Sequence, residues 1–225
     1  MRTEPARGDR VRSDTSPRRR DREATRARIL GAAVIEFARF GLSEARGERI
    51  ALRARSSERM LYYYFGSKEE LFRAALESVY ASLREAERSL RLDEEDSLAA
   101  LERFCRFVWH YYYEHPEFIS LVNTENLHQA KHLRKSAALE ELVSPVIGRI
   151  RELLEHGVAA GVFRAGIDAA ELYTIIAAQG YFVLSNRYTL SAVLGRDMTI
   201  PDQLEVHWCE SAELIRRYVQ TGNSR

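Results

Sequence analysis

The chain has few cysteines, no long apolar run and no strand-like stretch, and each absence excludes a class of protein. Its two cysteines, Cys105 and Cys209, lie far apart and belong to no metal-ligand or redox spacing. Both stand among apolar residues, so we expect two small core side chains rather than a disulfide. No apolar stretch approaches the roughly 20 residues that span a bilayer, and the N-terminus lacks the hydrophobic core of a signal peptide. The sequence therefore predicts a soluble, cytoplasmic protein with no membrane partner.

Runs of alternating β-branched residues bounded by turns, which mark strands, are also missing. Apolar residues instead recur at helical spacing, and signals for helix starts and stops divide them. Ser67 with Glu70 has the spacing of a capping box, as has Asp168 with Glu171. These features predict an all-α fold of about nine helices, including one long helix from Asp168 towards Leu194.

Charge is divided unevenly along the chain. The net charge of +1 hides an N-terminal part, residues 1–73, with 18 Lys and Arg against 11 Asp and Glu. The remainder has 16 against 22. Such asymmetry indicates a basic end that binds a polyanion, joined to a body with a different role. At 225 residues and 45% hydrophobic content, the chain can bury a sizeable core.

A compact helical module lies between Ile29 and Phe72. An amphipathic helix over residues 29–37 leads to a stop at Gly41, a second helix begins near residues 50–51, and an aromatic third helix covers residues 61–65. Three short apolar periodicities with Arg, Lys and Tyr between them are typical of a helix-turn-helix. In that motif one small helix enters the major groove of DNA and its neighbours hold phosphates. We therefore divide the chain into a basic arm over 1–21, disordered when free, a helix-turn-helix domain over 22–66 and a helical body over 67–225.

This module resembles the N-terminal domain of the TetR family of bacterial transcriptional regulators. The family pattern Phe-x-x-x-Gly falls on Phe37 to Gly41, its Ile-Ala on residues 50–51, and its Leu-Tyr-x-Tyr-Phe-x-Ser-Lys-Glu-x-Leu on residues 61–71. Similarity to one branch of the family continues through residues 116–133 and 181–188, so it covers most of residues 25–220. The resemblance implies a dimeric, ligand-responsive repressor that binds a palindromic operator in double-stranded DNA. It also implies that residues 67–225 bind an effector and form the dimer.

Position in the family pattern selects the residues that would contact DNA. Arg59, just inside the third helix, is the best candidate for a bidentate contact to guanine. The hydroxyls of Tyr62 and Tyr64 would meet phosphates, although at least one of the three successive helical tyrosines must pack inward. Lys68, at the start of a capped helix, would hold a phosphate together with the free N–H groups there. The candidate DNA-binding residues are Arg46, Arg49, Ser57, Glu58, Arg59, Met60, Tyr62, Tyr63, Tyr64 and Lys68.

The turn before the third helix departs from the family pattern, which favours Ala-Gly-Val-Ser where this chain has Ala-Arg-Ser-Ser at residues 54–57. If the turn needs a positive φ, Arg55 costs about 1 kcal/mol relative to glycine. Ser56 replaces an apolar residue, and Gly47 stands where a branched apolar side chain is common. These departures favour an alternative function, a helical dimer that binds a small molecule or a protein and whose DNA binding is weakened or lost. Salt-dependent DNA binding would exclude it.

The body carries polar and aromatic residues that could line a pocket for an unknown small-molecule effector. Gln179 and Asn186 interrupt an apolar helical stripe, and a buried amide needs a partner, either a ligand or neighbouring backbone. Glu125 shares a face with apolar residues, and carboxylates are seldom buried unpaired. The aromatic residues suit a core as well as a pocket. The candidate ligand-binding residues are Trp109, Tyr112, Tyr113, Phe118, Val122, Glu125, Asn126, Gln179, Phe182 and Asn186.

A seam of small and aromatic residues runs roughly opposite that stripe. Small residues let two helices approach closely, so the seam and the last helix together predict a two-fold, four-helix interface between two copies of the chain. The candidate interface residues are Tyr173, Ala177, Gly180, Leu184, Tyr188, Trp208 and Ile215.

Metal binding and catalysis are the remaining alternatives. Glu125, His128 and His132 would share one helical face, but no fourth ligand is evident. The acidic run at residues 93–96 has no facing acidic partner, and no spacing suggests a Ser/His/Asp or Cys/His set. We therefore expect neither an enzyme nor a resident metal or cofactor.

Overall fold

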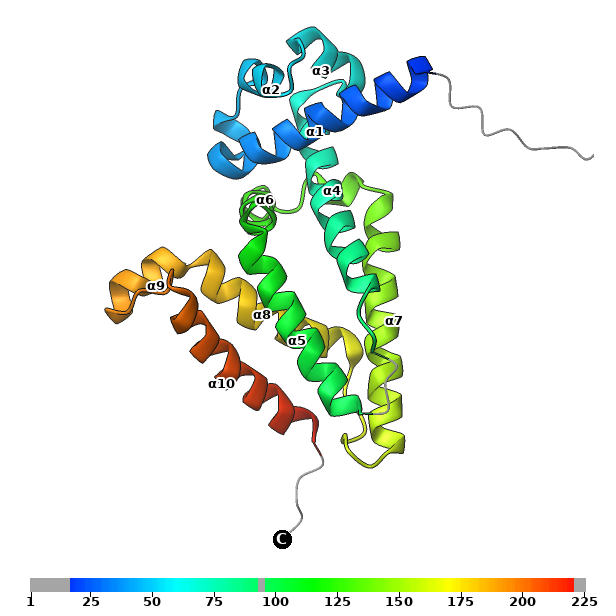
Figure 1. The fold of residues 1–225 in the computed structure, drawn as a ribbon, viewed down its shortest axis with the longest axis vertical. Helices are drawn as coiled ribbons and strands as arrows, with labels where there is room; N and C mark the ends of the chain where they lie inside the picture. Colours follow the sequence, from blue (N-terminus) through cyan, green and yellow to red (C-terminus); the bar gives the residue numbers. More distant parts are fainter. Residues whose placement is uncertain (1–16, 93–95, 221–225) are drawn as a thin grey trace, which may run out of the picture.

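The computed structural model describes residues 17–92 and 96–220, and its regular structure in these ranges is helical except for one isolated bridge between Phe163 and Gln220. The molecule is elongated. A module of α1–α3 lies at one end, and α4 runs from it into a body formed by the later helices (Figure 1). The helices are α1 (Pro17–Glu44), α2 (Gly47–Arg53), α3 (Glu58–Phe65), α4 (Lys68–Arg88), α5 (Ser97–Glu114), α6 (Pro116–Leu127), the short 3₁₀ helix η1 (Leu133–Lys135), α7 (Ala138–Ala159), α8 (Ala169–Ser185), α9 (Arg187–Leu194) and α10 (Pro201–Val219).

Helix α1 begins earlier than the sequence suggested. Pro17 stands at its first position, where a missing N–H costs nothing, and Arg19 pairs with Glu23 at 3.0 Å. The last five residues of the expected arm are therefore helical, and residues 1–16 lie outside the described ranges. Gly41, with φ of 67°, breaks the helix at the predicted stop, because this backbone conformation favours glycine.

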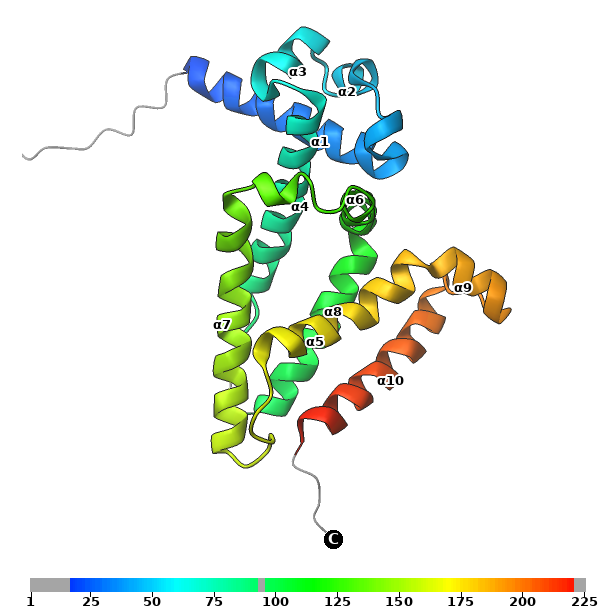
Figure 2. The same cartoon turned by 180° about the vertical axis from the view of Figure 1, so that it is seen from behind.

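Capping side chains begin the helices of the body at the predicted places. Ser67 accepts a hydrogen bond from the main-chain N–H of Glu70 at 3.1 Å, and Asp168 accepts one from Glu171 at 2.8 Å. Helix α7 lies beside α4, and α5 runs through the middle of the body. Helices α8 and α10 pack on the other side of α5 (Figure 2). Within the described residues, no helix is both long and apolar enough to cross a bilayer.

Three expectations about the body are wrong. The long helix after Asp168 is two helices, because α8 ends at Ser185 and α9 starts at Arg187. Glu125, His128 and His132 do not share one helical face, because the helix after Pro116 ends at Leu127 and Gln129 and Ala130 have positive φ values of 56° and 59°. Cys209 is exposed rather than part of the core, although Cys105 is buried as expected.

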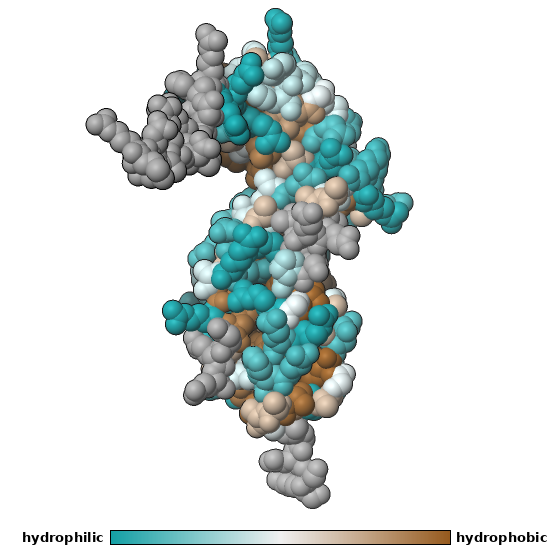
Figure 3. Space-filling view, turned by 90° about the vertical axis from the view of Figure 1, so that its right-hand side faces the viewer, coloured by the Kyte–Doolittle hydropathy of each residue, from teal (hydrophilic) through white to brown (hydrophobic). Residues whose placement is uncertain are grey.

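Packing between α1 and α6 joins the module to the body, across the constriction visible in the space-filling view (Figure 3). An edge-to-face chain of rings crosses this junction. Phe37 of α1 lies 5.2 Å from Phe72 of α4, and Phe72 lies 5.1 Å from the imidazole of His132. The position of the module therefore depends on side chains that belong to the body.

Candidate functional site

The turn before α3 confirms the expectation of a positive φ at residue 55. Arg55 has a φ of 49°, and the main-chain N–H of Ser56 closes the turn on the carbonyl of Ala51 at 2.9 Å. Ser57 then caps α3 by accepting a hydrogen bond from the N–H of Met60 at 3.3 Å. Local hydrogen bonds thus position the helix, and they require Arg55 to adopt the left-handed backbone conformation, which is unfavourable for a residue with a side chain.

Helix α3 turns one face into the module and the other outward. Leu61 and Phe65 are buried, as expected, and fix the rotation of the helix about its axis. Arg59, Tyr62 and Tyr63 are exposed. These three side chains of different chemistry, one charged and two phenolic, form an open surface on a rigid helix.

The tyrosine that packs inward is Tyr64. It is half-buried, and its ring meets the ring of Tyr63 edge-on at 5.2 Å. This arrangement leaves the hydroxyls of Tyr62 and Tyr63 to face outward. Burial, followed by the nearby Glu58 carboxylate, raises the pKa of Tyr62. Its hydroxyl therefore keeps its proton and remains a hydrogen-bond donor.

Gly47 has a structural role that the sequence did not suggest. A Cβ at this position would collide with the carboxylate of Glu58, so glycine allows Glu58 to lie against the start of α2. Glu58 is half-buried there, with its Oε1 3.5 Å from the hydroxyl of Tyr62. Glycine at residue 47, which departs from the family pattern, thus leaves the space that the Glu58 side chain occupies.

The other basic candidates already serve the module. Arg49 lies 2.5 Å from the buried Glu36 carboxylate and donates to the carbonyl of Glu44 at 2.8 Å. Arg46 is exposed, and its main-chain N–H donates to Glu36 at 3.1 Å. Lys68 donates to the carbonyl of Ser43 at 3.0 Å, which leaves two of its three donors available.

Sequence reasoning missed two arginines of α1 that lie close to the second and third helices. The guanidinium of Arg26 lies 4.8 Å from the ring centre of Phe65, and Arg28 donates to the carbonyl of Ala54 at 3.4 Å. Both are exposed. Only the basic character of residues 1–73 could have indicated them, because no motif places α1 beside α3.

The aromatic candidates of α5 and α6 lie in different places. Trp109 is buried and donates from its indole nitrogen to the carbonyl of Ile176 at 2.8 Å. Tyr112 and Phe118 are buried and stacked at 5.2 Å, whereas Val122 is half-buried and Tyr113 is exposed. The structure brings Tyr112 and Phe118 together, and separates them from Tyr113.

The polar candidates on α6 and α8 have partners in the chain. Gln179 accepts a hydrogen bond from Ser211 at 3.2 Å, and Asn186 donates to the carbonyl of Phe182 at 2.9 Å. Asn126 is exposed, and its amide lies 3.4 Å from the hydroxyl of Tyr181. Phe182 is 58% exposed. Hydrogen bonds within the chain thus account for these three amides, and their role in ligand binding stays a prediction.

Glu125 closes the chain after α6. It is 2% exposed, and its Oε1 accepts main-chain N–H groups from His132 at 2.7 Å and from Leu133 at 2.9 Å. Its Oε2 lies 2.7 Å from the Nδ1 of His132. His128 caps the end of α6 and His132 lies beyond it, and no cluster of three or more metal-ligating side chains occurs in residues 17–92 and 96–220. The carboxylate therefore has a structural role, because it holds the segment that follows α6.

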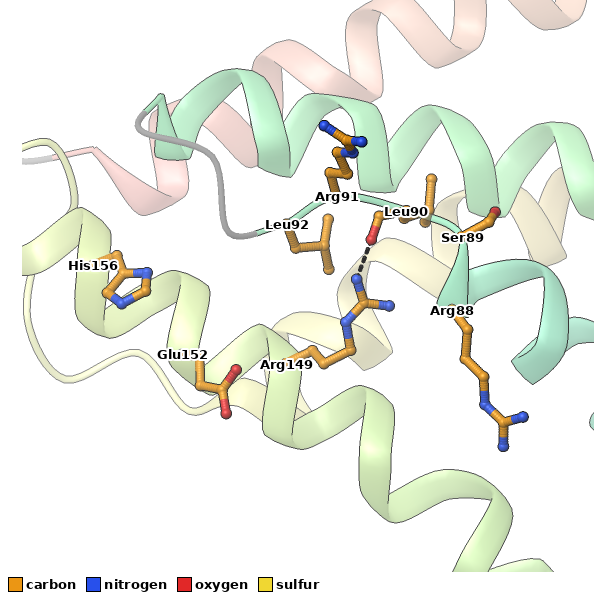
Figure 4. A pocket seen from close by; sticks show the side chains of 8 residues that line it. All are labelled: Arg88, Ser89, Leu90, Arg91, Leu92, Arg149, Glu152 and His156. Atoms are coloured by element: carbon orange, nitrogen blue, oxygen red, sulfur yellow. Dashed lines mark hydrogen bonds between the residues drawn. The ribbon is translucent and has the colours of Figure 1, made fainter.

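A cavity of about 600 Å³ opens where α4 ends beside α7 (Figure 4). Arg149 of α7 points to the end of α4, where it donates to the carbonyls of Glu87, at 2.6 Å, and Leu90. No candidate ligand residue from the sequence lies in its wall. The charged residues there resemble an ordinary solvated helix end, so sequence alone gave no signal. The wall is formed by Arg88, Ser89, Leu90, Arg91, Leu92, Arg149, Glu152 and His156.

Most of the candidate interface residues pack within one chain. Gly180 is buried so closely against Trp109 that a Cβ there would collide with the indole, and Leu184 is buried as well. The hydroxyl of Tyr173 accepts a hydrogen bond from Arg84 at 2.7 Å, inside the body. Ala177 is half-buried, Trp208 and Ile215 are buried, and Tyr188 is 69% exposed.

Comparison with known proteins agrees with this arrangement. Residues 29–75 match the family model of the tetR family of bacterial regulatory proteins, and residues 98–214 match that of a tetracyclin repressor-like C-terminal domain. The chain is 44% identical over 194 residues to the HTH-type transcriptional repressor NicS of Pseudomonas putida, covering 86% of this chain and 91% of that protein. It is 36% identical over 140 residues to the HTH-type transcriptional repressor SCO4008 of Streptomyces coelicolor, covering 62% and 69%.

A solved structure shows the same fold. A TetR transcriptional regulator from Chloroflexus aurantiacus superposes with a TM-score of 0.66 at 20% identity, covering 90% of this chain and 100% of that one. The family matches extend over both the α1–α3 module and the body, which fits the exposed face of α3 and the helical body behind it. The chain belongs to the TetR family of bacterial regulatory proteins and is a DNA-binding transcriptional regulator, not an enzyme.

Proposed function

We propose that the chain acts as a homodimeric repressor that binds a palindromic operator and is released by a small molecule. The exposed face of α3 carries the DNA-binding part of this proposal. Arg59 can donate two hydrogen bonds to guanine, and Tyr62 and Tyr63 can donate to bases or phosphates beside it. The name repressor is given to both NicS and SCO4008, which supports the negative sign of regulation.

The second copy would dock on the exposed faces of α8 and α10. Phe182 of α8 and Val206 and Leu214 of α10 are large apolar side chains that are each more than half exposed. The two helices pack together (Figure 2), so their exposed faces offer a two-fold surface for a four-helix interface. This surface replaces the seam expected from the sequence, of which only Tyr188 is open. A dimer would hold two copies of α3 about 34–36 Å apart on successive turns of DNA.

Release would follow from a shift between two arrangements of the modules. A small molecule that binds the body more tightly in the arrangement unable to span the operator lowers DNA affinity by that difference. Helix α4 packs on α1 and α3 of the module and on α7 of the body. A change in the packing of its C-terminal half would therefore move the module. Ligand binding and DNA binding are then coupled without direct contact.

DNA binding is tested by fluorescence anisotropy with the promoter beside the chain's own gene. We expect affinity to fall steeply with salt, because phosphate contacts release counterions. Arg59→Ala should weaken binding by about 5- to 150-fold, corresponding to about 1–3 kcal/mol. Arg151→Ala is the matched control, an exposed arginine of α7 outside both the module and the proposed dimer surface, and it should leave binding unchanged. Binding that ignores both salt and Arg59 would instead favour the dimer that has lost DNA recognition.

Dimerisation is tested by light scattering on variants of exposed valines. Val206→Glu places a charge on the proposed interface and should yield monomers, since an unpaired charge in an apolar contact is costly. Val193→Glu changes an even more exposed valine, in α9 and outside the proposed surface, and should leave the dimer intact. A monomeric wild type, or a dimer unaffected by Val206→Glu, contradicts this interface.

A further inference from the structure

The interior of the body holds an ion pair that sequence reasoning did not consider. Arg84 and Glu87 of α4 are 5% and 2% exposed, and Arg84 Nη1 lies 2.5 Å from Glu87 Oε2. Arg84 also donates to the hydroxyl of Tyr173 of α8 at 2.7 Å. Charged side chains are rarely buried to this extent in a helical core, so the pair needs a physical reason.

The pair is incompletely satisfied. Neither the Nε of Arg84 nor the Oε1 of Glu87 has a hydrogen-bond partner among the described residues, although both atoms are inaccessible to solvent. The hydroxyls of Tyr80 and Tyr112 lie close enough to Arg84 to interact with it electrostatically. Each unmet buried group costs about 1–3 kcal/mol, so a polar partner that enters from outside would gain several hydrogen bonds at once.

Charge selects an anionic partner. Two arginines, Arg84 and the nearby Arg149, interact electrostatically with the carboxylate of Glu87. Burial raises the pKa of Glu87 to about 7, against the opposing effect of the two arginines. Although burial favours the neutral form of Arg84, Tyr173 and Glu87 together raise its pKa, so it stays charged. Near neutrality the cluster therefore carries an excess of positive charge inside the body, where an uncompensated charge is costly.

The surroundings of the pair favour an aromatic ligand. Tyr112 and Phe118 are stacked, Tyr80 meets Phe118 edge-on at 5.1 Å, and the guanidinium of Arg84 lies 5.5 Å from the ring centre of Tyr173. A flat ring can join such a cluster by stacking or edge contacts, each of which contributes about 0.5–1.5 kcal/mol. An aliphatic chain of similar size would gain burial but no ring geometry.

A solvent-accessible space reaches the edge of this cluster. Arg149 forms part of the wall of the 600 Å³ cavity, and it also donates to the carbonyl of Glu87 (Figure 4). Arg149 of α7 thus connects the wall of the cavity to the turn of α4 that carries Glu87.

We propose that the body binds a small aromatic carboxylate, with the carboxylate on Arg84 and the ring against Tyr80, Tyr112 and Phe118. This inference rests on the proposed function, because it names the chemical class of the effector. Binding would satisfy the free Nε of Arg84 and neutralise the buried positive charge. Because Arg84 and Tyr80 belong to α4, occupation of this site acts on the helix that carries the α1–α3 module.

The proposal is tested by calorimetry on the full chain without DNA, with benzoate as probe and benzamide as its neutral counterpart. We expect benzoate to bind at least about tenfold more tightly than benzamide, since a charge-assisted hydrogen bond contributes about 1.5–3 kcal/mol. The double variant Arg84→Gln/Glu87→Gln keeps a neutral hydrogen-bonded pair and should lose the preference for benzoate. Arg151→Gln alters an exposed arginine of α7 that is not part of the cavity wall and should keep the preference for benzoate.

Each result decides the question. A failure of benzoate to bind the wild type, equal affinity for benzamide, or undiminished benzoate binding by the double variant overturns the proposal. If circular dichroism shows that the double variant does not fold, Arg84→Lys replaces it, because lysine keeps the charge but lacks the Nε–H donor. DNA binding is measured on the same preparations. Protein that binds DNA but not benzoate refutes this inference alone, whereas loss of DNA binding by the wild type refutes the proposed function.

Discussion

Replacing Glu125 should destabilise the chain strongly, because this carboxylate holds the segment that follows α6. It accepts two main-chain N–H groups, from His132 and Leu133, and a third contact from the His132 imidazole, all within 2.9 Å. All of these atoms lie at a site where Glu125 is 2% exposed. Water cannot easily replace a lost acceptor in such a place.

The magnitude follows from the groups that would be left without partners. Glu125→Ala strands two backbone donors and one ring nitrogen, and breaking a buried hydrogen-bonded pair costs about 3–5 kcal/mol. Glu125→Gln retains one acceptor oxygen but turns an NH₂ group towards a donor, so a loss of about 1–3 kcal/mol is expected. The ratio of the two losses in the free energy of unfolding therefore reflects how many of the hydrogen bonds depend on the second carboxylate oxygen.

Urea unfolding followed by circular dichroism measures both losses as changes in the free energy of unfolding. Glu114→Ala, an exposed carboxylate at the end of α5, is the matched control and should shift this free energy by less than about 0.5 kcal/mol. If Glu125→Ala unfolds with the same free energy as Glu114→Ala, the hydrogen-bonding account of Glu125 is wrong. Because His132 packs on Phe72, we also expect Glu125→Ala to weaken DNA binding through the junction.

Three smaller predictions concern backbone strain, packing and pH. Arg55→Gly relieves a φ of 49° and should raise the free energy of unfolding, measured in urea, by up to about 1 kcal/mol; an unchanged value would show that the turn is not strained. Gly180→Ala forces a methyl group against Trp109 and should lower it by about 1–3 kcal/mol, whereas Gly148→Ala, with nothing within 4 Å, should not lower it; equal effects would refute the close contact. Burial raises the pKa of Glu87 from 4.5 to about 7. The protonated form is therefore favoured in the folded chain, and its contribution to stability is complete below pH 4.5. The free energy of unfolding should fall by about 3 kcal/mol as pH rises through 7. Glu87→Gln should flatten that pH profile of unfolding, and an unchanged profile would show that another group titrates.

Local signals in the sequence predicted the frame of the molecule well. The caps at Ser67 and Asp168, the stop at Gly41 and the left-handed Arg55 all depend on residues within four positions of each other, so tertiary contacts hardly alter them. The end of α6 is a different case. Gln129 and Ala130 adopt positive φ without being glycine, and the long-range acceptor Glu125 holds the chain there.

Helical periodicity could not distinguish an apolar face that packs within the chain from one that packs against a second copy of the chain. The seam through Gly180 and Leu184 has the small residues of a close helix contact, and it does make one, but with α5 of the same chain. The pattern reports that a helix face will be covered, and the covering partner depends on the global arrangement. The exposed Phe182 belonged to the stripe predicted to line a pocket, although its surroundings leave it open.

The clearest limit of local reasoning lies in two ion pairs of α4. Arg84 with Glu87 and Arg88 with Glu85 have the same three-residue spacing, which in a sequence indicates solvated helix pairs worth a few tenths of a kcal/mol. In the structure the first pair is 5% and 3% exposed and the second 71% and 72%. Four residues along a helix make slightly more than one turn, so Arg84 and Arg88 leave the axis in similar directions. The difference arises because Tyr173 of α8 packs against Arg84, whereas Arg88 is the last residue of α4 and remains exposed. Burial changes the same chemistry from a surface contact into a charged group that requires a partner, and this difference supports a ligand site at Arg84 rather than at Arg88.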